Sequence, residues 1–88
     1  MSYEIEWTVP ALRELRELDK QTGRRIVLAV TALGTDPRPP GCRALTGRPA
    51  GVMRIRIGDH RVIYQVEDAR VSVTVVRVAH RREVHRKP

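Results

Sequence analysis

Apolar and polar residues alternate at the start of the chain, where Tyr3, Ile5 and Trp7 are separated by two glutamates. A period of two is typical of a β-strand with one buried face, so residues 3–7 are predicted to form a strand. The pattern does not show whether this strand lies at the edge or in the centre of a sheet.

The period lengthens after Thr8, where apolar residues recur every three or four positions, as they do on the buried face of a helix. Thr8 is a good N-cap and Pro10 is acceptable in the first turn, which predicts a helix over residues 10–19. The pattern restarts at Thr22, which is predicted to cap a second helix that ends at Gly34. The short connection between them indicates a helical hairpin.

Residues 35–51 are rich in proline and glycine, which predicts an irregular surface loop carrying Arg38, Arg43 and Arg48. Three segments rich in valine and isoleucine follow, at residues 52–57, 61–66 and 71–78. Gly58-Asp59 is a signal for a two-residue hairpin, and Asp68-Ala69 separates the last two segments.

These elements predict a single α+β domain over residues 1–88. It consists of an N-terminal strand, a two-helix hairpin, a three-strand antiparallel sheet and a short basic C-terminal tail.

The hairpin turn sets the strand register and places Ile57 opposite His60 and Arg56 opposite Arg61. A second turn through Asp68-Ala69 places Val66 opposite Val71 in the same way. One face is then apolar and is predicted to be the core. Its members are Met53, Ile55, Ile57, Val62, Tyr64, Val66, Val71, Val73 and Val75, and parity adds Arg77 at the strand end. The other face carries Arg54, Arg56, Arg61, Ile63, Gln65, Ser72, Thr74, Val76 and Val78.

The charge balance favours an anionic partner, because 17 Lys and Arg residues against 10 Asp and Glu residues give a net charge of +7. An aromatic content of 3% argues against a surface on which bases stack. The single Cys42 excludes an internal disulfide and favours a reducing, cytoplasmic compartment. No metal-ligand, cofactor or membrane motif is evident, so we expect chemistry without a metal or cofactor.

The most informative feature is the pairing of Arg56 with Arg61, because like charges opposite each other destabilise a sheet unless an anion lies between them. The alternative is that these side chains extend into solvent or pair with Glu4, Glu6, Asp59 or Glu67. Arginine forks suit the charge that develops on a phosphate during RNA cleavage. Among the histidines, His85 is the first candidate for proton transfer, before His80 and His60.

Three segments, at residues 45–47, 53–64 and 75–86, together resemble the RelE family of toxins from bacterial and archaeal toxin-antitoxin pairs. The resemblance implies a RelE/ParE-like fold, a RelB-like antitoxin as partner, and cleavage of mRNA in the ribosomal decoding site. It implies that Arg54, Arg56, Arg61 and Arg81 surround the scissile phosphate. A tyrosine usually stands at the position of His85, which is the fifth predicted catalytic residue. Further RNA contacts are expected from Arg43, Arg48, His80, Arg82 and Arg86.

Three functions remain open at this stage. The first is a ribosome-dependent endoribonuclease in which the 2'-hydroxyl of the RNA attacks, leaving a 2',3'-cyclic phosphate. The second is a ParE-like toxin that inhibits DNA gyrase by protein contact. The third is a catalytically weak member that only binds RNA or an antitoxin.

Overall fold

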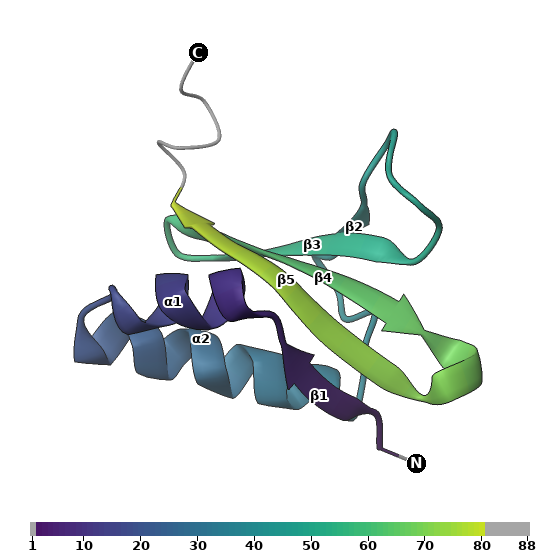
Figure 1. The fold of residues 1–88 in the computed structure, drawn as a ribbon, viewed down its shortest axis with the longest axis horizontal. Helices are drawn as coiled ribbons and strands as arrows, with labels where there is room; N and C mark the ends of the chain where they lie inside the picture. Colours follow the sequence, from purple (N-terminus) through teal and green to yellow (C-terminus); the bar gives the residue numbers. More distant parts are fainter. Residues whose placement is uncertain (1, 81–88) are drawn as a thin grey trace.

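Two helices cover one face of a five-stranded sheet in the computed structural model, which describes residues 2–80 (Figure 1). The strand order is β1-β5-β4-β3-β2, with β1 parallel to β5 and the other neighbours antiparallel. The elements are β1 (Glu4–Trp7), α1 (Val9–Arg16), α2 (Lys20–Leu33), β2 (Arg43–Ala44), β3 (Val52–Ile57), β4 (His60–Glu67), a 3-10 turn (Asp68–Arg70) and β5 (Ser72–His80). The predicted α+β fold is confirmed, and β2 is a short strand inside the segment predicted to be irregular.

The first helix is capped as predicted, and the second is capped by a different residue. The Thr8 hydroxyl accepts a hydrogen bond from the Ala11 N–H at 3.3 Å. The predicted cap Thr22 instead lies inside α2, because the Asp19 carboxylate accepts its N–H at 3.1 Å and starts the helix three residues earlier. Asp19, which the prediction placed at the end of the first helix, is thereby the cap of the second.

The N-terminal strand lies at the edge of the sheet, next to the C-terminal strand β5, in parallel register from Glu4 opposite Ser72 to Trp7 opposite Val75. Where β1 ends, the Thr8 N–H continues the pairing by donating to the Val75 carbonyl at 3.0 Å. The chain then turns into α1, which packs against the rest of β5. β1 and β5 are therefore neighbours in the sheet although they lie near opposite ends of the sequence.

The first hairpin has the predicted register, with Ile57 opposite His60 and Arg56 opposite Arg61. The second is shifted by two residues, because a 3-10 turn replaces the tight turn and Val66 pairs with Val73. Val71, predicted to be in the core, adopts a left-handed conformation with φ of 51° at the end of that turn.

The prediction was also wrong for two further residues, because β5 contains a bulge. Tyr64 pairs with Val75 and Ile63 with Arg77, which leaves Val76 as an extra residue and reverses the faces beyond it. Val78, predicted on the arginine face, is therefore buried at 3% exposure, and Arg77, predicted on the core face, is exposed.

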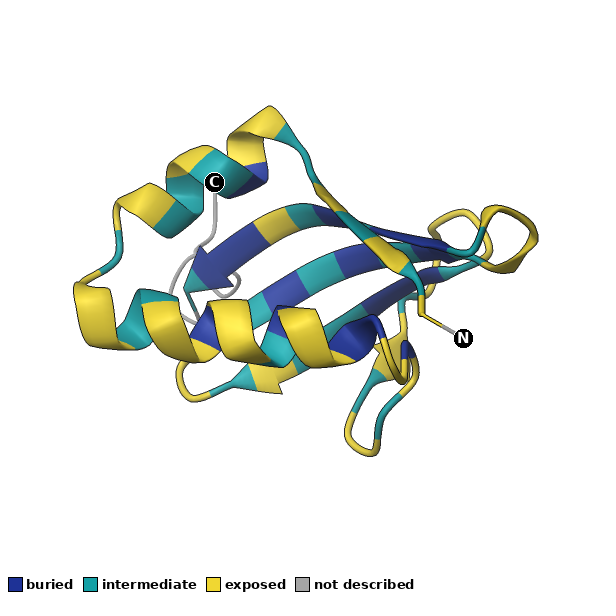
Figure 2. Ribbon diagram, turned by 90° about the horizontal axis from the view of Figure 1, so that it is seen from below, coloured by how far each residue is buried: buried dark blue, intermediate teal, exposed yellow. Residues whose placement is uncertain are grey.

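The core lies between the helices and the sheet, where buried positions of the strands face both helices (Figure 2). Its largest fully buried side chains are Tyr64, Ile26, Leu33, Val30, Val62, Val73 and Val75. Within the described part of the chain, neither helix is long and apolar enough to cross a membrane.

Candidate functional site

Four arginines meet on the sheet face that points away from the helices. Arg43 of β2 lies opposite Arg54 of β3, and Arg56 of β3 lies opposite Arg61 of β4. Together with Gly41 these side chains line a hollow of about 400 Å³, which we call the arginine hollow. Strand alternation explains the grouping, because residues next to these arginines along the strands, such as Met53 and Val62, point into the core.

Three of the four arginines of the hollow have no carboxylate partner within the described residues. Within residues 2–80, Arg43, Arg54 and Arg56 form no ion pair. The ion pairs of the described chain lie elsewhere, between Arg38 and Asp68, Arg70 and Glu67, and Arg77 and Glu14. Carboxylate pairing was left open for Arg56 and Arg61, and within the described residues it does not account for Arg56. The hollow is therefore suited to an anion.

A hydrogen-bonded clamp holds the loop that brings Gly41 and Arg43 to the hollow. The Arg38 guanidinium donates two hydrogen bonds to the Asp68 carboxylate, at 3.2 and 3.0 Å, and the Tyr3 hydroxyl donates a third at 2.7 Å. These donors stabilise the charged carboxylate and lower the pKa of Asp68 below its ordinary value. The clamp joins the loop to the turn before β5.

Tyr64 anchors the same loop from inside the core. Its buried hydroxyl donates a hydrogen bond to the Pro37 carbonyl at 2.9 Å. Burial raises the pKa of Tyr64 far above its ordinary range, so the hydroxyl stays a donor throughout the physiological pH range. Neither this bond nor the lining position of Gly41 was predicted, because neither depends on local periodicity.

Two other predicted contact residues, Arg48 and His80, are not among the residues that line the hollow. Arg48 is exposed near the tip of the loop. His80 pairs with His60 at the end of the sheet and lines recesses beside the helices. The remaining predicted residues, Arg81, Arg82, His85 and Arg86, lie outside the described residues.

Residues 5–85 match the family model described as ParE toxin of type II toxin-antitoxin system, parDE. Toxin RelG of Mycobacterium tuberculosis is 30% identical over 88 residues, which are 99% of this chain and 100% of the relative. The chain belongs to the RelE/ParE superfamily of type II toxins. The predicted family is therefore confirmed at the level of the superfamily.

The fold of this toxin is similar to that of the toxin chains of two solved toxin-antitoxin complexes. The RelBE2 complex of Mycobacterium tuberculosis matches with a TM-score of 0.79 and 28% identity, over 92% of this chain and 100% of the matched chain. The archaeal RelE-RelB complex of Pyrococcus horikoshii OT3 matches with a TM-score of 0.82 and 26% identity, over 92% and 97% of the two chains. These matches confirm the predicted fold.

Proposed function

We propose that this toxin is a ribosome-dependent endoribonuclease that cleaves mRNA in the decoding site. The observation that carries the proposal is the arginine hollow, where Arg43, Arg54, Arg56 and Arg61 converge. Guanidinium groups bind phosphate oxygens through paired, permanently charged donors. A hollow walled by them fits an RNA phosphodiester better than a flat protein contact.

The chemistry follows from where the charge develops. The 2'-hydroxyl attacks the adjacent phosphorus, the bond to the 5'-oxygen breaks, and the products carry a 2',3'-cyclic phosphate and a 5'-hydroxyl. The pentacoordinate intermediate carries more negative charge than the phosphodiester, so fixed guanidiniums bind it more tightly than the substrate. Arg54, Arg56 and Arg61 are the described residues that we assign to this stabilisation, and Arg81 of the tail is the fourth.

Proton transfer is assigned to the tail, because within the described residues the lining of the hollow consists of Gly41 and arginines. Arginine stays protonated at neutral pH and is a poor acid or base. Histidine is the side chain that ordinarily changes its protonation near neutral pH, so His85 is our candidate. Binding of the mRNA by the ribosome supplies the alignment that the hollow alone does not.

Cleavage of mRNA in a translation extract, mapped by primer extension, tests the proposal. We expect cuts in phase with codons, and we expect Arg61→Ala to slow cleavage by about 100-fold, the usual effect of removing one stabilising donor. Arg13→Ala is the matched control, because it removes the same charge from an exposed position of α1. Equal losses in the two variants would show that the hollow acts only through total charge.

Inhibition of DNA gyrase is the second candidate function, because the matching family model is that of a ParE toxin. A supercoiling assay with the same protein separates the two. Intact mRNA together with inhibited supercoiling would contradict the endoribonuclease, and no effect in either assay would favour a binding protein without catalysis.

The histidine at position 85 gives a prediction of its own. A tyrosine hydroxyl can also transfer a proton, and its ring stacks on a base over a larger area, so we expect His85→Tyr to preserve or increase the rate of mRNA cleavage in the same extract. Loss of cleavage in this variant would show that the imidazole itself transfers the proton.

The partners and location follow from the proposed function. A RelB-like antitoxin would neutralise the toxin, and the ribosome and mRNA would be its targets, all of them in the cytoplasm. Both structural relatives named above are complexes with an antitoxin.

A further inference from the structure

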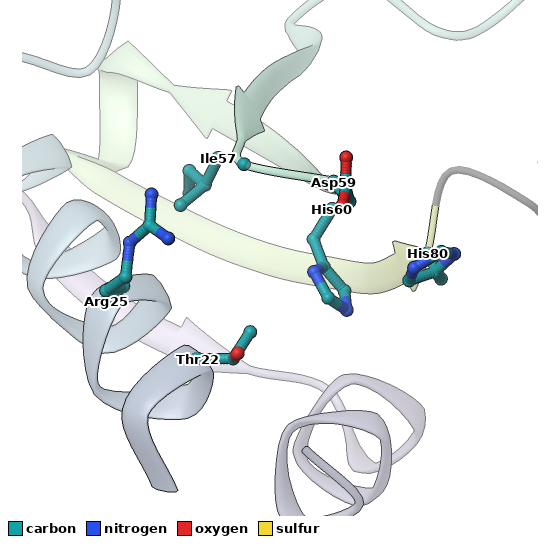
Figure 3. Close-up of a pocket in the computed structure, with 7 residues that line it drawn as sticks. Thr22, Arg25, Ile57, Asp59, His60 and His80 are labelled. Carbon is teal, nitrogen blue, oxygen red and sulfur yellow. The ribbon is translucent and has the colours of Figure 1, made fainter. Parts of the chain in front are cut away.

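A second recess lies on the helix side of the sheet, at the tip of the β3–β4 hairpin. It has a volume of about 190 Å³, and we call it the tip recess. Figure 3 shows Arg25 and Thr22 of α2 on one side of it and His60 and His80 on the other. The arginine hollow, by contrast, shares none of these residues.

Arg25 supplies the positive charge of this recess. Its guanidinium lies over the hairpin turn, where a Cβ built on Gly58 would be 3.6 Å from both of its terminal nitrogens. Within residues 2–80 it forms no ion pair with a carboxylate. A guanidinium with no carboxylate partner within the described residues attracts an anion.

The two imidazoles separate this guanidinium from a group of carboxylates. The rings of His60 and His80 lie perpendicular with centroids 4.9 Å apart. Beyond them, on the α1 side, Glu14 and Glu17 line another recess with the same histidines. An anion is repelled from that side and attracted to the α2 side, where the Arg25 guanidinium lies.

One carboxylate does belong to the tip recess. Asp59 stands at the hairpin turn, and in Figure 3 it lies above His60, on the opposite side from Thr22. The space between Arg25, Thr22 and the imidazole of His60 is therefore the part that is suited to an anion.

We propose that the tip recess binds a phosphate group of the RNA strand that enters the arginine hollow. This inference rests on the proposed function. The pair Ile57 and His60 follows directly after the pair Arg56 and Arg61 in the hairpin, so residues that line the hollow and the recess are neighbours along both strands, with side chains on opposite faces. An RNA strand that passes over the hairpin tip meets the hollow first and then the recess.

Two variants of equal charge test the proposal. Arg25→Gln removes the guanidinium from the recess, and Arg24→Gln removes one from the neighbouring exposed position, which does not line it. Each lowers the formal net charge of the full chain from +7 by one, to +6. Arg25→Lys is a further variant that keeps the charge and loses the fork, and circular dichroism checks that each variant is folded.

The first measurement uses inorganic phosphate as the probe and follows the imidazole signals of His60 by NMR. We expect saturable shifts that Arg25→Gln weakens at least fivefold and Arg24→Gln leaves nearly unchanged. Absence of saturation, or equal weakening in both variants, would overturn the phosphate site.

The second measurement uses a short single-stranded RNA with a 2'-deoxy sugar at the cleavage position and records its affinity as a function of salt. Loss of one phosphate contact lowers the slope of log affinity against log salt by about 0.7. We expect this change in Arg25→Gln and not in Arg24→Gln. An unchanged slope in Arg25→Gln, with phosphate still bound, would assign the recess to free phosphate and overturn its role in RNA binding.

The third comparison separates this inference from the proposed function. If the hollow holds RNA, Arg54→Gln weakens RNA binding. Unchanged RNA binding in Arg54→Gln would contradict the proposed function. The phosphate titration reports on the recess in either case. If Arg25→Gln weakens binding of the antitoxin and leaves the RNA slope unchanged, the recess is a protein contact and the inference is wrong.

Discussion

At the scale of single residues, Glu14 has an unusual role because its side chain completes the edge of a sheet. Its carboxylate accepts the Val78 N–H and the Arg77 Nε, each at 2.8 Å, beyond the point where β1 ends. Burial raises the pKa of Glu14, but the hydrogen bonds from Arg77 and Val78 outweigh it and hold the pKa below its ordinary value.

Glu14→Gln is expected to lower the free energy of unfolding by about 1–3 kcal/mol, the usual range for hydrogen bonds to a charged group. Because the pKa is lowered in the folded state, this stabilisation is complete above the ordinary value of 4.5 and is lost as the pH falls through the native pKa. Urea unfolding at several pH values measures the difference, which should close in acid. Glu17→Gln, at an exposed position of the same helix end, is the control. A difference that does not depend on pH would contradict the role of the charge.

At the scale of elements, the loop over residues 35–51 decides the shape of the arginine hollow. It carries only the short strand β2, yet it brings Gly41 and Arg43 beside the arginines of β3 and β4. Its position depends on the Tyr64 hydroxyl inside the core and on the clamp between Arg38 and Asp68 at the surface. The loop is thus held both from inside the core and at the surface.

Tyr64→Phe is expected to loosen this loop while the sheet stays intact. The variant leaves the Pro37 carbonyl without its donor, which costs about 1–2 kcal/mol. Hydrogen exchange of the Cys42 and Leu45 amides, which bond within the loop and to β3, should become several-fold faster. Tyr3→Phe removes an exposed hydroxyl and leaves the Arg38–Asp68 pair, so it serves as the control. Equal exchange in the two variants would mean that the core anchor does not hold the loop.

At the scale of the whole molecule, four of the 17 basic residues are gathered where the described structure is concave. The helices carry exposed arginines as well, but the described hollow gathers four of them on three adjacent strands. Charge gathered in a concave site raises the local concentration of an anion more than the same charge spread over a surface.

Binding of single-stranded RNA should therefore depend strongly on salt. With three or four phosphates neutralised, the slope of log affinity against log salt is expected to be about −2 to −3 between roughly 50 and 200 mM salt. Fluorescence anisotropy with a short labelled RNA measures it. Replacing Arg54, Arg56 and Arg61 together by glutamine should reduce the slope by about 2. A slope that the triple variant leaves unchanged would place the RNA elsewhere on the toxin.

Local patterns in the sequence determined the part of the site that depends on neighbours along the chain. The alternation of β3 and β4 and the Gly58-Asp59 turn are local, so the shared face of Arg54, Arg56 and Arg61 followed from them and is confirmed by the register. The turn at Asp68 did not follow, because a 3-10 turn and a bulge at Val76 depend on how β5 packs against β4. A shift of this kind moved Val78 into the core and Arg77 to the surface.

Only the tertiary structure decided which distant segments complete the sites. Arg43 and Gly41 reach the hollow through bonds between residues 27 to 30 positions apart, from Tyr64 to Pro37 and from Arg38 to Asp68. The tip recess joins α2, the hairpin and the end of β5 in the same way. Hydrophobic periodicity reports which face of an element is buried, but it carries no information about which other element covers that face. The arginine face could thus be read from the sequence, whereas the hollow and the recess are products of packing.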